Sequence, residues 1–60
     1  MTPETRLDIE VEVRVDGTWW PGFLEHRRQR DGRWEGFVRW TRGPGLNHLG
    51  WYDYNQLREA

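Results

Sequence analysis

Two aromatic-rich segments, residues 19–24 and 34–40, constrain the fold of this chain most strongly. Each segment places large aromatic side chains around a glycine, a composition that suits strands in a tightly curved sheet. The second segment leads into residues 41–45, whose Gly-Pro-Gly sequence indicates a sharp turn. We therefore predict that the two segments pair as the central strands of a small barrel.

The length of 60 residues and the absence of Cys limit how the chain can be stabilised. A domain of this size buries only about 60% of the surface that its unfolded chain exposes, and neither disulfides nor thiolate metal sites can help here. Five Trp, two Tyr and two Phe must supply the core, since each buried aromatic removes about 150–250 Å² from water. We predict one domain over residues 7–60, after a disordered N-terminus at residues 1–6.

The first part of the chain has the pattern of three strands joined by two tight hairpins. Residues 7–15 alternate apolar and charged side chains, which is the period of a strand with one face in water. Asp16-Gly17 and Asp31-Gly32 are strong hairpin-turn sequences. We therefore expect the next two strands over residues 18–28 and 34–41.

The last part of the chain has the pattern of a short strand, one helical turn and a final strand. The short strand covers residues 46–52, and Asp53 has the side-chain oxygens that cap a helical turn over residues 53–56. Residues 57–59 then complete the sheet. These elements predict an all-β fold, a five-stranded, partly open barrel with one short helical turn before the last strand.

The motifs around the two hairpins resemble those of Tudor domains. The matching residues are Asp16-Gly17, Trp20-Pro21-Gly22, Leu24, Gly36-Phe37-Val38-Arg39-Trp40-Thr41 and Leu57-Arg58. The resemblance covers most of the chain from about Val11 onward, and it implies an SH3-like (Tudor-like) barrel, shared with chromo-barrel, MBT and PWWP domains. It also implies a non-enzymatic reader, because many members of this superfamily bind methylated Lys or Arg in an aromatic cage.

Two cage positions of the family fall on aromatic residues of this chain, Trp20 and Trp40. The remaining cage positions fall near Val13, Gly43 and Gly45, which are not aromatic. The resemblance thus implies half a cage, which aromatic residues after the third strand would complete. The predicted ligand groove is lined by Trp20, Trp40, Trp51, Tyr52 and Tyr54. In the competing interpretation, Trp20 and Trp40 are core residues that seal one end of the barrel.

A second group of aromatic residues alternates onto the opposite face of the central strands. The group consists of Trp19, Phe23 and Phe37. Contiguous exposed aromatics are typical of a partner surface, so self-association through this face is one hypothesis. Alternatively, the curvature of the barrel or the N-terminal segment covers these residues. Strict alternation along the second strand also places His26 on the other face, together with Leu24.

Arginines cluster around the second hairpin and the strand that follows it. They are Arg27, Arg28, Arg30, Arg33, Arg39 and Arg42. Guanidinium groups next to aromatic rings can bind phosphates and stack on bases, so a nucleic-acid-binding accessory domain is another hypothesis. Against it stand Glu25, Asp31 and Glu35 in the same segment, and the net charge of −1 for the whole chain.

Residues suited to catalysis or metal binding are scarce. The sequence has no Ser, Cys or Lys, so it lacks the usual nucleophiles, and we predict that the protein is not an enzyme. His26 and His48 have no neighbouring ligands at metal-site spacing, so no metal or cofactor is expected. Residues 1–8 lack the apolar core of a signal peptide, and no segment approaches the roughly 20 apolar residues that span a bilayer. A cytoplasmic monomer without membrane contacts is the default expectation.

The sequence therefore favours a non-catalytic binding module. We predict that it recognises a peptide or protein segment, including segments that present Arg or a methylated cation, through the aromatic groove. Nucleic-acid binding through the arginines and self-association through the outer aromatics are the two alternatives.

Overall fold

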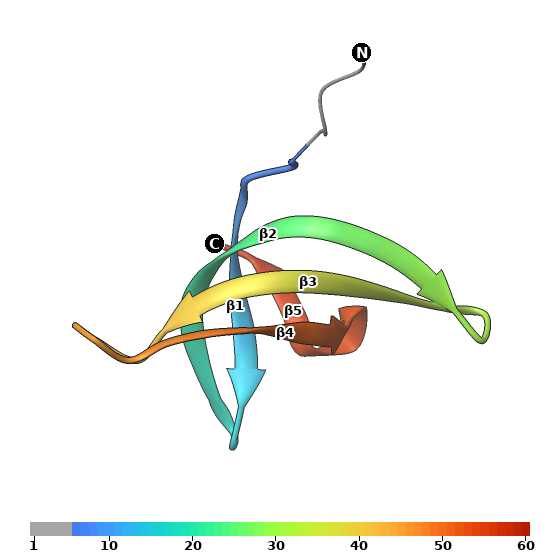
Figure 1. The fold of residues 1–60 in the computed structure, drawn as a ribbon. Helices are drawn as coiled ribbons and strands as arrows, with labels where there is room; N and C mark the ends of the chain where they lie inside the picture. The colour runs from blue at the N-terminus through green and yellow to red at the C-terminus, as the bar shows by residue number, and fades with distance from the viewer. Residues whose placement is uncertain (1–5) are drawn as a thin grey trace, which may run out of the picture.

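The computed structural model describes residues 6–60 and shows one antiparallel β-sheet (Figure 1). Its strands are β1 (Ile9–Val15), β2 (Thr18–Arg30), β3 (Arg33–Thr41), β4 (Asn47–Asp53) and β5 (Leu57–Glu59). Their order across the sheet is β4-β3-β2-β1-β5, and the two outermost strands do not pair with each other. A 3-10 helix, η1 (Tyr54–Gln56), precedes the last strand. The predicted fold class, a five-stranded, partly open barrel, is confirmed.

Both predicted hairpin turns are present, each built from two successive residues with positive φ. Asp16 and Gly17 have φ angles of 54° and 75°, and Asp31 and Gly32 have φ angles of 51° and 75°. Two left-handed residues in a two-residue loop match the right-handed twist of the flanking strands. Asp visits this conformation more readily than most residues, and Gly adopts it without strain. The two Asp-Gly sequences therefore explain both turns.

A β-bulge interrupts the alternation of β2 between Leu24 and His26. Leu24 pairs with Val38 of β3, whereas His26 pairs with the adjacent residue Phe37, so Glu25 is the extra residue. An extra residue moves the side chains that follow it to the other face of the strand. His26 therefore lies on the face of Phe37, with 6.1 Å between the two ring centroids. The prediction that His26 shares a face with Leu24 is wrong.

The extra residue of the bulge, Glu25, is buried although it carries a carboxylate. Its Oε2 lies 3.1 Å from Arg39 Nε and 3.8 Å from Arg6 Nη2, and its carbonyl oxygen accepts a hydrogen bond of 3.0 Å from the backbone N–H of Leu7. A buried charge requires such partners, which hold the bulge in place. The predicted disordered terminus lies outside the described residues except for Arg6, which belongs to this ion-pair group.

The core lies on the inner face of the curved sheet, between β1, β2 and β3. Its buried members are Val11, Val13, Leu24, Val38 and Trp40, and partly buried hydrophobic residues pack around them. Gly22 pairs with Trp40 across β2 and β3. A methyl group at Gly22 would lie 2.7 Å from the carbonyl oxygen of Arg39 and 2.8 Å from Trp40 Cβ. The close approach of the two strands thus depends on the missing side chain at this position.

The turn between β4 and β5 forms as predicted. The carboxylate of Asp53 accepts a hydrogen bond of 3.0 Å from the backbone N–H of Asn55, which is the capping role expected from its side-chain oxygens. Gln56 Nε2 donates to the carbonyl oxygen of Arg14 at 3.4 Å and so connects η1 to β1. Across residues 6–60, no helix has the length and apolar character needed to cross a membrane.

Candidate binding surface

The predicted cage aromatics Trp20 and Trp40 do meet, at one end of the barrel. Their ring centroids are 6.3 Å apart, with an angle of 36° between the ring planes. Trp40 is only 4% exposed, its Nε1 donates to Tyr52 Oη at 2.9 Å, and His48 stacks on its ring at 4.5 Å. Trp20 is partly buried, and its Nε1 donates to the carbonyl oxygen of Val15 at 3.4 Å. Trp40 is therefore a core residue, as in the competing interpretation of the sequence.

A cation of the chain itself lies against these two indoles. Arg42 Cζ is 5.2 Å from the ring centroid of Trp20 and 5.3 Å from that of Trp40, and both distances are within cation–π range. Arg42 Nη2 also donates to Asp16 Oδ2 at 3.1 Å. This contact joins the loop after β3 to the first hairpin turn. The indole rings of Trp20 and Trp40 thus already have a cationic partner within the chain.

The structure separates the other residues of the predicted groove. Tyr52 stays with Trp40, but Trp51 lies on the opposite face of β4. Successive residues of a strand point to opposite faces, so Trp51 and Tyr52 cannot line one groove. Tyr54 follows the strand in η1. Of the predicted groove residues, the structure brings together Trp20, Trp40 and Tyr52.

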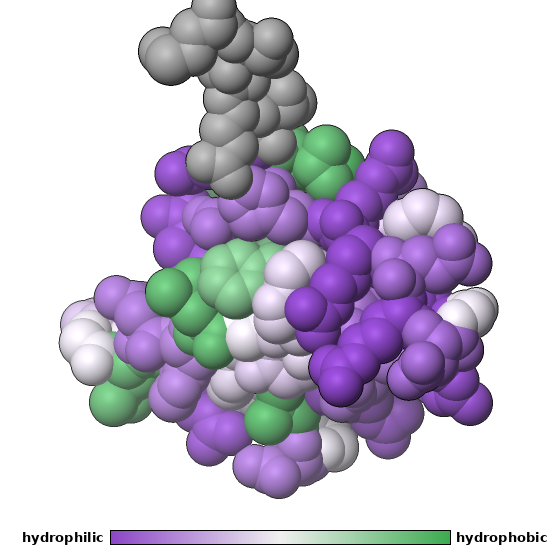
Figure 2. All heavy atoms as spheres, turned by 45° about the vertical axis from the view of Figure 1, so that its right-hand side comes forward, coloured by the Kyte–Doolittle hydropathy of each residue, from purple (hydrophilic) through white to green (hydrophobic). Residues whose placement is uncertain are grey.

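Apolar side chains gather on the outer face, the side of β2, β3 and β4 that points away from the core. We define the outer face by Phe23, Phe37, Arg39, Leu49 and Trp51. Phe37 contacts Trp51 with 5.2 Å between ring centroids, and Arg39 Cζ lies 5.5 Å from the ring centroid of Phe23. Phe23, Leu49 and Trp51 are 41%, 63% and 37% exposed. Figure 2 shows a face of the molecule on which hydrophobic residues gather near the middle, bordered by hydrophilic ones.

The predicted interface residue Trp19 lies apart from this group. It pairs with Arg14 of β1 close to the first hairpin turn, and Arg58 Cζ lies 4.1 Å from its ring centroid. The outer face thus includes two of the predicted interface residues, Phe23 and Phe37, and leaves Trp19 at the far end of β2.

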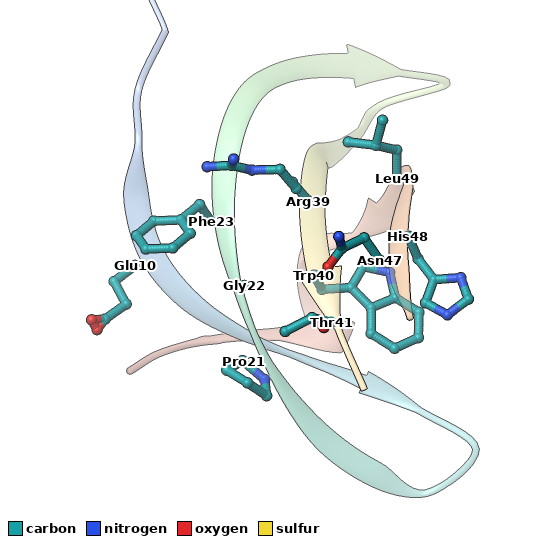
Figure 3. A pocket seen from close by; sticks show the side chains of 10 residues that line it. All are labelled: Glu10, Pro21, Gly22, Phe23, Arg39, Trp40, Thr41, Asn47, His48 and Leu49. Atoms are coloured by element: carbon teal, nitrogen blue, oxygen red, sulfur yellow. The ribbon is translucent and has the colours of Figure 1, made fainter. Parts of the chain in front are cut away.

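An open groove of about 560 Å³ crosses the strands on the outer face (Figure 3). Its lining residues are Glu10, Pro21, Gly22, Phe23, Arg39, Trp40, Thr41, Asn47, His48 and Leu49. Phe23 and Leu49 supply apolar walls, and the guanidinium of Arg39 extends toward the ring of Phe23. Glu10 and Asn47 add polar groups on the two sides of the groove. The outer face therefore combines apolar surface with both hydrogen-bond donors and hydrogen-bond acceptors.

Seven lining residues of this groove were not among the predicted site residues: Glu10, Pro21, Gly22, Thr41, Asn47, His48 and Leu49. The alternation of β4 held a signal for Leu49, because it lies two residues before Trp51 and therefore on the same face. Glu10 and Asn47 reach the groove through the register of β1 with β2 and of β4 with β3. The two-residue Asp16-Gly17 turn already fixes the register of β1 with β2, whereas the longer loop between β3 and β4 fixes no register for Asn47.

Most of the arginines predicted to contact an anion are paired with carboxylates. The pairs are Arg28–Glu35, Arg33–Asp53, Arg39–Glu25 and Arg42–Asp16, with N–O distances between 2.8 and 3.4 Å. Arg28 Cζ also lies 4.0 Å from the ring centroid of Trp51, and Arg27 Cζ lies 5.9 Å from that of Trp34. Within residues 6–60, Arg27 and Arg30 form no ion pair with a carboxylate. Much of the positive charge is thus balanced within the fold.

Comparison of the chain with protein-family models, curated proteins and solved structures finds no match. The resemblance to Tudor domains therefore stays a prediction from sequence motifs. Among the described residues, no three His, Cys, Asp or Glu side chains gather closely enough to hold a metal ion.

Proposed function

We propose that this chain is a non-catalytic binding module of the cytoplasm that recognises a peptide or protein segment through the groove on its outer face. The observation that carries the proposal is the groove itself, an apolar hollow with a few polar groups on the side of the sheet that does not form the core. Ligand sites are typically concave and mostly apolar, with a small number of polar groups that orient the ligand. The absence of Ser, Cys and Lys supports a role without covalent chemistry.

The side chains around the groove indicate which kind of segment would fit. An apolar side chain of the ligand would pack against Phe23 or Leu49, which are both exposed and lie on either side of Arg39 in the sheet. Arg39 pairs with Glu25 through Nε, and its side chain is still 50% exposed. Its terminal nitrogens can therefore donate to a carbonyl or carboxylate oxygen of the ligand. We propose a ligand that has an apolar residue and an acidic residue close together in its sequence.

This proposal moves the binding surface away from the aromatic groove expected from the sequence. Binding of a methylated cation between Trp20 and Trp40 would require Arg42 to leave both rings and its partner Asp16. The groove on the outer face requires no such rearrangement. The ion pairs of Arg28, Arg33 and Arg42 likewise favour a peptide over a nucleic acid, because neutralising phosphates requires cations that are free to contact them.

Replacement of Phe23 with serine is expected to weaken peptide binding about tenfold or more, a loss typical of an anchoring aromatic residue. The probes are synthetic peptides enriched from a phage-displayed random library on the immobilised wild-type domain. Their dissociation constants are measured by fluorescence anisotropy. Leu46→Ser is the matched control, because Leu46 is 55% exposed but does not line the groove.

The control variant should bind the peptides with wild-type affinity, and thermal unfolding should show that both variants stay folded. The proposal fails if no peptide is enriched, or if the enriched peptides bind Phe23→Ser and the wild type equally well. Enriched sequences that lack neighbouring apolar and acidic residues would refute the proposed ligand class.

A further inference from the structure

The two edges of the sheet differ in how they are protected. β5 has three residues, and two of them, Arg58 and Glu59, are charged. β4 has seven residues, pairs only with β3 within the described part of the chain, and carries a single charge, Asp53, at its end. Natural edge strands are usually protected by charges, prolines, bulges or short length. β4 contains no proline and has a regular register with β3, so its free edge is open to a further strand.

The residues of β4 are arranged almost symmetrically around Gly50. Leu49 and Trp51 flank it on the outer face, and both are exposed. His48 and Tyr52 lie two residues away on the inner face, and polar residues end the strand on both sides. A two-fold axis pairs identical surfaces and therefore requires a surface that complements itself. The sequence of β4 meets this requirement.

We propose that β4 pairs with β4 of a second copy of the chain, antiparallel and about a two-fold axis at Gly50. In this register Leu49 faces Trp51 of the second copy, and Trp51 faces Leu49 of the second copy. Two apolar cross-strand pairs then form on the outer face, and such pairs are the unit of sheet stabilisation. Gly50 faces Gly50, so no side chains collide on the axis.

The polar residues of β4 fit the same register. Asp53 faces Asn47 of the second copy, so a carboxylate meets an amide that can donate to it, and no like charges are opposed. A shift of the axis to Trp51 would place Leu49 opposite Asp53. A shift to Leu49 would place Trp51 opposite Asn47. Only the axis at Gly50 pairs apolar with apolar and polar with polar residues.

This pairing goes beyond the proposed function, because it needs no peptide. It would join the outer faces of the two copies, since Leu49 also lines the groove. One pair of strands with its side chains is expected to bury less than the roughly 1,200–2,000 Å² of a stable interface. We therefore expect a weak dimer that forms at high protein concentration.

Sedimentation equilibrium of the wild-type chain without peptide tests the pairing. The mass should rise from 7.3 kDa toward twice that value between about 10 µM and about 1 mM, the concentrations at which a small interface is expected to form. Leu49→Lys and Trp51→Glu should each weaken the dimer about tenfold or more, because each variant places a charge in both apolar pairs. The double variant should recover most of the affinity, since the introduced lysine then faces the introduced glutamate of the other copy.

Leu46→Lys is the matched control, because it adds the same charge at an exposed leucine outside β4, and it should dimerise like the wild type. A monomeric mass at every concentration would overturn the proposal, and an extended peptide would then be the alternative occupant of this edge. Single variants that dimerise like the wild type, or a double variant as weak as the single ones, would overturn it too. None of these outcomes affects the comparison of Phe23→Ser with the wild type in peptide binding.

Discussion

Replacement of Trp40 with alanine is expected to remove most of the stability of this domain. Trp40 is a buried member of the core and carries its largest side chain. Truncation of a buried large aromatic costs about 3–5 kcal/mol. A chain of this length is stabilised by roughly 3–9 kcal/mol in total, at about 0.05–0.15 kcal/mol per residue. A urea titration followed by far-UV circular dichroism should show a largely unfolded protein or a much lower midpoint.

Tyr52→Phe tests the same part of the core with a smaller change. It keeps the ring of Tyr52 but removes the oxygen that accepts the hydrogen bond from Trp40 Nε1 at 2.9 Å. A buried donor without a partner costs about 1–3 kcal/mol, so this variant should be folded, with a lower midpoint than the wild type. If Trp40→Ala unfolded at the same urea concentration as the wild type, Trp40 would not be a core residue, and the rings of Trp20 and Trp40 would be available to a ligand.

Replacement of Gly22 with alanine is also expected to be strongly destabilising, although alanine costs a strand less backbone entropy than glycine. The added methyl group would lie 2.7 Å from the carbonyl oxygen of Arg39 and 2.8 Å from Trp40 Cβ. These atoms belong to β3 itself and cannot move without shifting the strand. Overpacking of this kind costs about 1–3 kcal/mol, which corresponds to a decrease of roughly 4–24 °C in Tm for a domain of this size. Differential scanning fluorimetry measures the decrease.

Gly50→Ala is the matched control for Gly22→Ala. A methyl group at Gly50 would approach ring atoms of Tyr52 at 3.3 Å, and a side chain on an edge strand can move more easily than a central backbone. This variant should lose much less in Tm at low protein concentration. Equal losses for both variants would contradict the tight contact between β2 and β3.

The elements that local chemistry determines could be predicted from the sequence. The Asp-Gly pairs at positions 16–17 and 31–32 adopt the left-handed turn that their residue types allow. The alternation of β1 and the cap at Asp53 also appear in the structure as expected. Each of these features depends on residues that lie within a few positions of one another, so a single sequence contains the information.

The features that depend on irregular pairing or on several strands together could not be predicted. The bulge at Glu25 is a property of the register between β2 and β3, and its stability comes from Arg39 and Arg6, which lie far from it in the sequence. Part of the assignment of aromatic residues to the two faces could be predicted, because Trp51 and Tyr52 are neighbours in a strand and must point to opposite faces. The groove on the outer face combines residues of four strands, so it emerges only once the sheet is assembled.

The position of the binding surface is tested most directly by a chemical-shift titration of isotope-labelled protein with one of the enriched peptides. Binding in the outer groove predicts the largest shifts at the backbone amides of Phe23, Arg39 and Leu49, while the indole N–H signals of Trp20 and Trp40 stay in place. If the largest shifts occurred at those two indoles and the signals of the outer face stayed unchanged, the ligand would bind at Trp20 and Trp40, which would contradict the proposed site.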